Sequence, residues 1–233
     1  MRWQKITQMT TPISILSTKK LSVNQKQFLL NANFALVEAD FISIQQTKFE
    51  METVNDNLIF TSQNAVLSLI ENMDGSPTLD LLKAKTVFCV GMKTKQLLEE
   101  NGFNVIAYTG YAADLSEIIT LIYGQEKFTF FSGNLRRDTL PDALSNADVV
   151  FNEIQVYETL LTPQKITASF DGILFFSPSA VESYLKNNKI KKEMCFCIGT
   201  TTAEAVAKVT ENIVIANQPT VENTIIQCIN EYK

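Results

Sequence analysis

Short apolar runs alternate with longer helical segments along almost the whole chain, and this alternation limits the fold more than any other feature. The apolar runs are rich in β-branched and aromatic residues, as buried strands are. Strands are expected at 13–17, 57–61, 86–90, 104–108, 128–132, 172–176, 194–198 and 213–216. Strands that alternate with helices are typical of a parallel sheet covered by helices on both faces. The sequence therefore predicts an α/β fold.

The two halves of the chain resemble each other. LIFTSQNAVLSLI at 58–70 aligns with LFFSPSAVESYL at 174–185, and VFCVGMKTKQLL at 87–98 aligns with CFCIGTTTAEAV at 195–206. A fainter match joins ILSTKKL near the start to FFSGNLRRDTL near residue 130. An internal repeat of this kind predicts two similar lobes.

Two stretches fall outside the repeat, VEADFISIQQ at 37–46 and VVFNEIQVYETLL at 149–161. Both alternate polar and apolar residues, as exposed or half-exposed strands do. If they pair with each other, they form a two-stranded connector between the lobes.

The charge of the chain disfavours polyanionic partners. The formal net charge is -5 and the sequence pI is near 4.9, so the overall field repels nucleic acid and anionic membranes. Basic pairs such as Lys19–Lys20 and Arg136–Arg137 are interpreted as solvated surface. An anionic ligand must therefore be held by local donors.

Cysteine and histidine usage argues against a metal site. The four cysteines show no CxxC spacing and the chain has no histidine, so a zinc site is not expected. Three of the cysteines lie in strand-like runs and are interpreted as reduced structural thiols. No apolar stretch is long enough for a signal peptide or a membrane span, and residues 1–10 are expected to be a loose leader. We expect a cytoplasmic protein that contacts neither nucleic acid nor membrane.

Polar turns follow several of the predicted strands and open the next helices. In α/β sheets, ligands bind at the carboxyl ends of the strands, where helix N-termini present unpaired N–H groups. The alternative is that these residues are only good helix caps and tight turns. Both halves use the same turn types, which favours ligand binding. The candidate binding residues in these turns are Thr61, Ser62, Gln63, Asn64, Gly91, Thr94, Ser132, Gly133, Ser177, Pro178, Ser179, Gly199, Thr201 and Thr202.

The strong catalytic motifs are absent from the sequence. It contains no GxGxxG, Walker or GxSxG motif, and the lack of histidine leaves carboxylates, Lys, Cys and Tyr as acid–base candidates. Tyr157 is singled out because it lies in the expected connector, where its side chain could face the space between the lobes. The alternative is a packing tyrosine with a solvated hydroxyl.

Six stretches, in this order, resemble the motifs of the uroporphyrinogen-III synthase family. They are FTSQNAV at 60–66, VGMKT at 90–94, GNLRRD at 133–138, VYET at 156–159, FFSPSAVESY at 175–184 and CIGTTTAEA at 197–205. The resemblance covers nearly all of residues 13–230. The VGMKT turn departs from the family pattern, because Lys93 and Lys95 make it more basic.

This resemblance implies an organisation in two flavodoxin-like lobes, each a doubly wound parallel sheet, joined by a two-stranded β linker. The first lobe would be discontinuous, with residues 1–40 and 160–233, and the second would comprise residues 45–155. The linker strands would be at about 37–46 and 150–161.

The resemblance also implies an activity. The substrate would be hydroxymethylbilane, a linear tetrapyrrole, which is closed to uroporphyrinogen III with inversion of ring D and loss of water. No cofactor or metal is implied. Tyr157 would be catalytic, hydrogen-bonding to the departing hydroxyl, while the turns and Arg136 would bind the substrate carboxylates.

The same resemblance implies a monomer, which could make a transient contact with the preceding enzyme of the pathway. The competing hypothesis is a non-enzymatic two-lobed module that binds a small anion, as solute-binding proteins do.

Overall fold

The computed structural model describes residues 12–51 and 53–233; the expected leader at residues 1–10 lies outside this range. Internal contacts divide the chain into two compact units. Unit 1 consists of Met1–Ser43 and Leu161–Lys233, and unit 2 of Ile44–Leu160. Among the described residues, no helix is long and apolar enough to cross a membrane.

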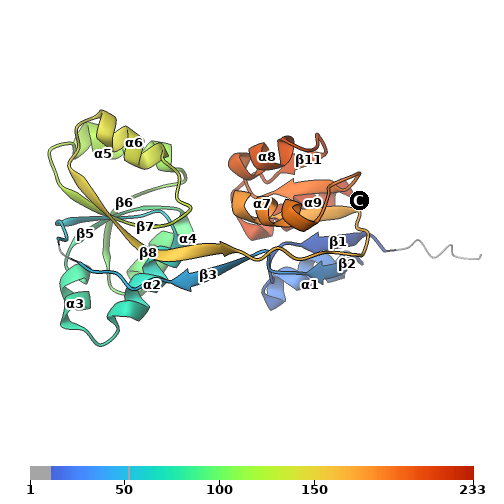
Figure 1. Cartoon of the computed structure of the whole chain (residues 1–233), viewed down its shortest axis with the longest axis horizontal. Helices are drawn as coiled ribbons and strands as arrows, with labels where there is room; N and C mark the ends of the chain where they lie inside the picture. The colour runs from blue at the N-terminus through green and yellow to red at the C-terminus, as the bar shows by residue number, and fades with distance from the viewer. Residues whose placement is uncertain (1–11, 52) are drawn as a thin grey trace, which may run out of the picture. The chain divides into compact units, whose positions relative to one another are not determined.

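Unit 1 is built around a parallel sheet, with helices on both faces (Figure 1). In chain order its elements are β1 (Ser14–Ser17), α1 (Val23–Asn31), β2 (Ala35–Glu38), β9 (Gly172–Phe175), α7 (Pro178–Asn187), β10 (Met194–Cys197), α8 (Thr200–Ala207), β11 (Ile213–Ile215) and α9 (Val221–Glu231).

The strands of unit 1 lie in the order β11-β10-β9-β1-β2, and every neighbouring pair is parallel. Side chains alternate between the two faces of each strand. Leu16 packs into a core with α7 and α8, whereas Ile15 packs into a second core with α1 and α9. Burial on both faces is why these strands appear as continuous apolar runs in the sequence.

Unit 2 has the same layered construction (Figure 1). Its elements are β4 (Asn57–Phe60), α2 (Gln63–Met73), α3 (Pro77–Lys83), β5 (Thr86–Val90), α4 (Met92–Glu100), β6 (Asn104–Thr109), α5 (Ala112–Ile122), β7 (Phe128–Gly133), α6 (Thr139–Asn146) and β8 (Phe151–Leu161). The strand order is β3-β8-β7-β4-β5-β6, with β3 (Ile42–Gln46) at one edge.

The two faces of the unit 2 sheet are also divided by alternation. Leu58 and Phe60 pack with α2, α3 and α4, whereas Ile59 packs with α5 and α6. Phe60 and Phe131, on the paired strands β4 and β7, stack with ring centroids 5.1 Å apart.

The two sheets share one topology, in circularly permuted form. Numbered along the chain, the strands of unit 1 lie in the order 2-1-3-4-5. The parallel strands of unit 2 give the same order if the count begins at β7, so that β7, β8, β4, β5 and β6 take the places of β1, β2, β9, β10 and β11. The three sequence matches of the repeat fall on these equivalent strands.

The connector predicted at 37–46 is partly wrong. Residues 35–38 form β2, which pairs with β1 at the edge of the unit 1 sheet, and only Ile42–Gln46 pairs with β8. An edge strand is half exposed, so β2 shows the same polar–apolar alternation as a connector strand. Thr47 N donates to Val156 O and Thr162 N donates to Phe41 O. These two bonds indicate that β3 and β8 run antiparallel.

Candidate functional site

In each unit there are two adjacent parallel strands whose following connections lead to opposite sides of the sheet. These strands are β1 and β9 in unit 1 and β7 and β4 in unit 2; after each pair, the connecting helices cover opposite faces of the sheet. The carboxyl ends of such a strand pair are the usual ligand site of an open α/β sheet. Most of the predicted site residues lie at the carboxyl ends of these strands or of a strand next to them in the sheet.

The turns after β4 and β9 are closed by serine caps. Ser62 Oγ accepts a hydrogen bond from Asn64 N at 3.1 Å, and Ser177 Oγ accepts one from Ala180 N at 3.1 Å. Ser177 Oγ also lies 3.0 Å from Ser179 Oγ. The caps occupy one N–H group of each helix, so Ser62 and Ser177 act as helix caps. Thr61, Gln63 and Pro178 complete the two turns.

The turns after β5 and β10 begin with glycine and have no side-chain cap. Gly91 precedes α4 and Gly199 precedes α8, and neither supplies a hydrogen bond to its helix from a side chain. Gly91 has a φ of 90°, a left-handed conformation that glycine adopts without strain. Helix N-termini that lack a side-chain cap can offer N–H groups to an anion.

A buried threonine stands at the same place in each glycine turn. Thr94 is 4% exposed and Thr202 is 1% exposed. The N–H of each donates to the carbonyl oxygen of the turn glycine at 3.1 Å. The Oγ1 of Thr94 lies beside Gly91, 3.6 Å from where a β-carbon would be. Thr201, next to Thr202, is half-buried.

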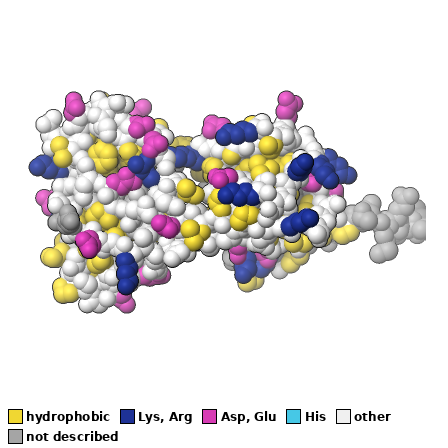
Figure 2. All heavy atoms as spheres, in the orientation of Figure 1, with side chains coloured by type: hydrophobic (Ala, Val, Ile, Leu, Met, Phe, Trp, Pro, Cys, Tyr) yellow, Lys and Arg dark blue, Asp and Glu magenta, His cyan; other side chains and the backbone are white. Residues whose placement is uncertain are grey.

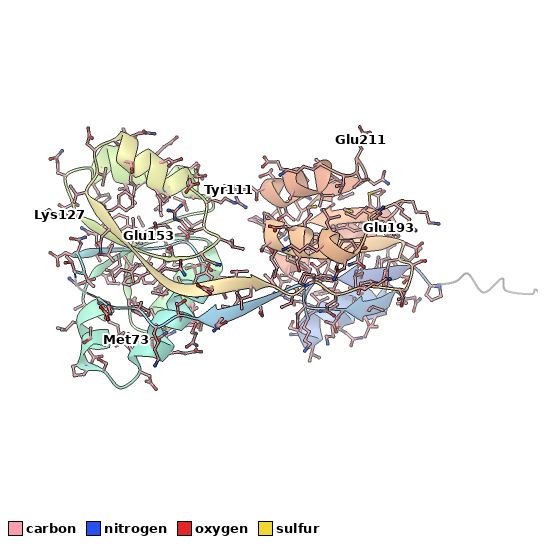
Figure 3. The ribbon with its side chains drawn as sticks, in the orientation of Figure 1. Met73, Tyr111, Lys127, Glu153, Glu193 and Glu211 are labelled. Carbon is pink, nitrogen blue, oxygen red and sulfur yellow. The ribbon has the colours of Figure 1, made fainter. Side chains whose placement is uncertain are left out.

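The turn after β7 carries an ion-pair network. Arg136 Nε lies 2.6 Å from Glu153 Oε1, Arg136 Nη2 lies 2.9 Å from Glu153 Oε2, and Arg136 Nη1 pairs with Asp138. Ser132 Oγ donates to Glu153 Oε1. Figure 3 labels Glu153, at the start of the long strand β8. Arg136 is therefore neutralised by the protein's own carboxylates.

The ion pair shifts the titration of both partners. Partial burial opposes ionisation of Glu153, but hydrogen bonds from Arg136 and Ser132 more than offset it, so the pKa of Glu153 is lowered. The hydrogen bond to Glu153 raises the pKa of Arg136 above its ordinary value. Sequence reasoning missed Glu153, although its place on a strand next to the turn is the signal that could have suggested it.

Tyr157 is mostly buried. It is 9% exposed and belongs to the core under α2, and its ring lies against Gly133 on the neighbouring strand. Among the described residues, only Thr47 Oγ1 and Ser183 Oγ are enclosed without a hydrogen-bond partner. The Tyr157 hydroxyl is not enclosed in this way. The ring of Tyr157 is therefore packed into the core of unit 2.

Sequence reasoning also missed the turn after β1. Thr18 is 1% exposed, and its Oγ1 donates to Leu174 O at 2.8 Å. Lys19 follows it, with Nζ 5.8 Å from the centroid of the Phe176 ring. This places a cation beside the serine turn of unit 1. The fainter repeat, which aligns this segment with the Arg136 segment, was the available signal.

Burial keeps the cysteine thiols protonated at neutral pH. Burial raises the pKa of Cys89, Cys195 and Cys197 to about 12, so their thiols stay protonated. In residues 12–51 and 53–233, no cluster of acidic or cysteine side chains could hold a metal ion. The remaining acid–base groups near the strand ends are tyrosine, lysine and carboxylates.

Charged side chains of both signs are interspersed over the visible face of each unit (Figure 2). An anion therefore finds no large basic surface on this face. Binding would depend on the turns, of which unit 2 contributes Thr61–Asn64, Gly91–Thr94, Ser132 and Arg136, and unit 1 contributes Ser177–Ser179 and Gly199–Thr202.

The sheets and turns define a parallel α/β protein with strand-end amides suited to an anionic ligand. The family described as "Uroporphyrinogen-III synthase HemD" matches residues 34–226. The chain therefore belongs to the uroporphyrinogen-III synthase family, whose members are cyclising lyases.

Solved structures of this family have the same fold. The chain is similar to the uroporphyrinogen-III synthetase of Helicobacter pylori, with a TM-score of 0.73 and 20% identity over 94% of this chain and 99% of that chain. It is also similar to a mutant uroporphyrinogen III synthase of Thermus thermophilus, with a TM-score of 0.65 and 14% identity over 95% of this chain and 100% of that chain. No curated protein matches the sequence.

Proposed function

We propose that this chain is a uroporphyrinogen-III synthase that acts on hydroxymethylbilane. The enzyme closes this linear tetrapyrrole to uroporphyrinogen III, inverts ring D and releases the terminal hydroxyl as water. Family membership over residues 34–226 supports the reaction. The observation that carries the binding site is the repetition of one serine turn and one uncapped glycine turn at the carboxyl ends of both sheets.

The main task of the protein is to orient the substrate. Ring closure without the enzyme gives the uninverted isomer, so catalysis requires the substituted carbon of ring D to be held nearest to the reacting carbon. Orientation of this kind can supply a large part of a rate enhancement. The acetate and propionate carboxylates suit the amides of the glycine turns, and the Thr94 hydroxyl lies beside Gly91.

The strand-end turns of each unit are candidate binding sites for the substrate. The 2-1-3-4-5 strand order is that of flavodoxin-like folds, which supports two flavodoxin-like lobes joined by the β3–β8 ladder as a linker. Each lobe would bind part of the tetrapyrrole at its own strand ends. The protein would act as a monomer in the cytoplasm, in keeping with its net charge and its reduced, buried cysteines.

Tyr157 would assist the first step. Its hydroxyl would donate a hydrogen bond to the terminal oxygen of the bilane while the carbon–oxygen bond breaks and the oxygen leaves as water. The substituted carbon of ring D then attacks the carbon that lost the hydroxyl and gives a spiro intermediate. The original bond between ring D and its bridging carbon breaks and re-forms at the other α-carbon of ring D, and the proton lost at the end of the reaction balances the one taken up by the leaving group. The packing of the Tyr157 ring in the core, which fixes the direction of the side chain, supports this role.

The test is product analysis with freshly generated hydroxymethylbilane. The product is oxidised, and type I and type III porphyrins are separated by chromatography, with a protein-free reaction as the control. The proposal predicts mainly type III product in the presence of the protein. Type I product alone would contradict the activity, and binding of the bilane without turnover would favour the anion-binding module instead.

A further inference from the structure

A β-bulge determines which way Tyr157 points. Along the β7–β8 ladder, Ser132 pairs with Gln155 but the next residue, Gly133, pairs with Tyr157, so Val156 is an extra residue in β8. In a regular strand Val156 and Tyr157 would face opposite sides of the sheet. Here both belong to the same core. The bulge therefore turns Tyr157 to the face covered by α2.

Gly133 provides the space that the turned ring needs. A β-carbon on Gly133 would lie 2.5 Å from Cε2 and 2.8 Å from Cε1 of Tyr157, and closer still to Cζ. These distances are far below van der Waals contact. The φ of Gly133 is not positive, so its backbone does not require glycine. Glycine is needed here because any side chain would displace the ring of Tyr157.

Asn134 holds β8 on the other side of the bulge. Its backbone N–H donates to Tyr157 O at 3.3 Å, and its Oδ1 accepts from Thr159 N at 2.8 Å. Its Nδ2 lies 3.4 Å from Thr159 O. The side chain thus continues the strand pairing beyond Gly133, where β7 ends. Tyr157 is fixed by the close approach of Gly133 to its ring and by the backbone hydrogen bond from Asn134.

We propose that Gly133 is a positioning residue for Tyr157, with Asn134 as its support, and that neither residue acts by contacting substrate. The inference deepens the proposed function, since it rests on the role of the Tyr157 hydroxyl. A shift of the ring would move that hydroxyl away from the leaving oxygen while leaving the carboxylate-binding turns in place. The effect should therefore appear in kcat more than in KM.

The experiment compares Gly133→Ala with Gly110→Ala in the full chain. Gly110 lies in the same unit, and a β-carbon there would have no atom within 4 Å. Gly133→Ala is expected to lower kcat by roughly tenfold or more with KM changed less than about threefold, since small misplacements of reacting groups are costly. Gly110→Ala should retain the kcat of the unsubstituted enzyme. Circular dichroism checks that both variants are folded.

A double-mutant cycle separates this inference from the proposed role of Tyr157. If Gly133 acts through the hydroxyl, then Gly133→Ala should change kcat less than about twofold in a Tyr157→Phe background. An equal loss in both backgrounds would overturn the inference, as would an unchanged kcat for Gly133→Ala when Tyr157→Phe is impaired. An unimpaired Tyr157→Phe would instead refute the role of the hydroxyl.

Asn134 variants supply a second test that does not depend on how well Gly133→Ala folds. Asn134→Asp keeps an oxygen that can accept from Thr159 N, whereas Asn134→Ala removes it. The inference predicts a lower kcat for Asn134→Ala and substantial rescue in Asn134→Asp. Equal kcat values for the two variants would contradict it.

Discussion

Glu153 accepts two hydrogen bonds from Arg136, with Nε–Oε1 and Nη2–Oε2 distances of 2.6 and 2.9 Å. A two-point pair of this geometry fixes both side chains. It ties the turn after Gly133 to β8 a few residues before Tyr157. A substrate carboxylate that bound Arg136 would have to compete with Glu153 for the guanidinium.

This ion pair should make part of the stability pH-dependent. The folded state lowers the pKa of Glu153, so the pair stabilises the protein above the unfolded value of about 4.3 and is lost as pH falls through the lower folded value. Urea unfolding at pH 7 and at about pH 3 should show a smaller loss of stability in Glu153→Gln than in the unsubstituted protein. An identical loss in both would show that the pair makes no contribution.

Removal of the Tyr157 hydroxyl should slow the reaction without unfolding the protein. The ring stays packed in Tyr157→Phe, so its stability should change little, while kcat should fall by about a hundredfold if general-acid assistance is lost. Steady-state kinetics and the type III fraction are the measurements. Unchanged turnover and isomer ratio would remove Tyr157 from the mechanism.

The two buried threonines should contribute to substrate binding in the same way. Thr94 and Thr202 occupy equivalent positions, and valine replaces either side chain at nearly the same volume without its hydroxyl. A hydrogen bond to a charged group is worth about 1.5–3 kcal/mol, so each variant should lose roughly tenfold or more in kcat/KM. The threonine-to-serine variants are the matched controls. If Thr202→Val has unaltered kinetics, Thr202 is structural only.

Alanine substitution of two equivalent serines, one in each unit, should change the thermal midpoint in opposite directions. Ser68 in α2 donates to Val156 O, whereas Ser183 in α7 is fully buried with no partner for its Oγ. Ser183→Ala removes an unsatisfied group and should raise the thermal midpoint by about 2–4 °C. Ser68→Ala breaks a buried hydrogen bond and should lower it by a similar amount. The same direction of change in both variants would contradict this account.

Continuous apolar runs predicted the buried strands, because a strand that is covered on both faces has apolar residues at every position. The expected strand at 86–90 coincides with β5, and those at 57–61 and 172–176 differ from β4 and β9 by one residue. The alternation at 37–46 predicts a connector strand, but its first two residues belong to the edge strand β2, since half-exposed strands of either kind alternate in the same way. Periodicity reports burial and carries no information about the partner of a strand.

The turns were also predictable, but their partners were not. Ser62 and Gly91 follow apolar runs in the sequence, so their positions at strand ends could be inferred. The pairing of Arg136 with Glu153 depends on the register of β7 and β8, which local sequence does not specify. The direction of Tyr157 depends on a single extra residue in that ladder, and strand alternation alone predicts the opposite face.

The central claim is that the strand-end turns of each unit bind the tetrapyrrole. Backbone amide NMR shifts measured during anaerobic titration with uroporphyrinogen III test it most directly. The account predicts saturable shifts at Gly91–Thr94 of unit 2 and at Gly199–Thr202 of unit 1 with a single dissociation constant. Shifts confined to one unit, or found only at the opposite ends of the strands, would contradict it.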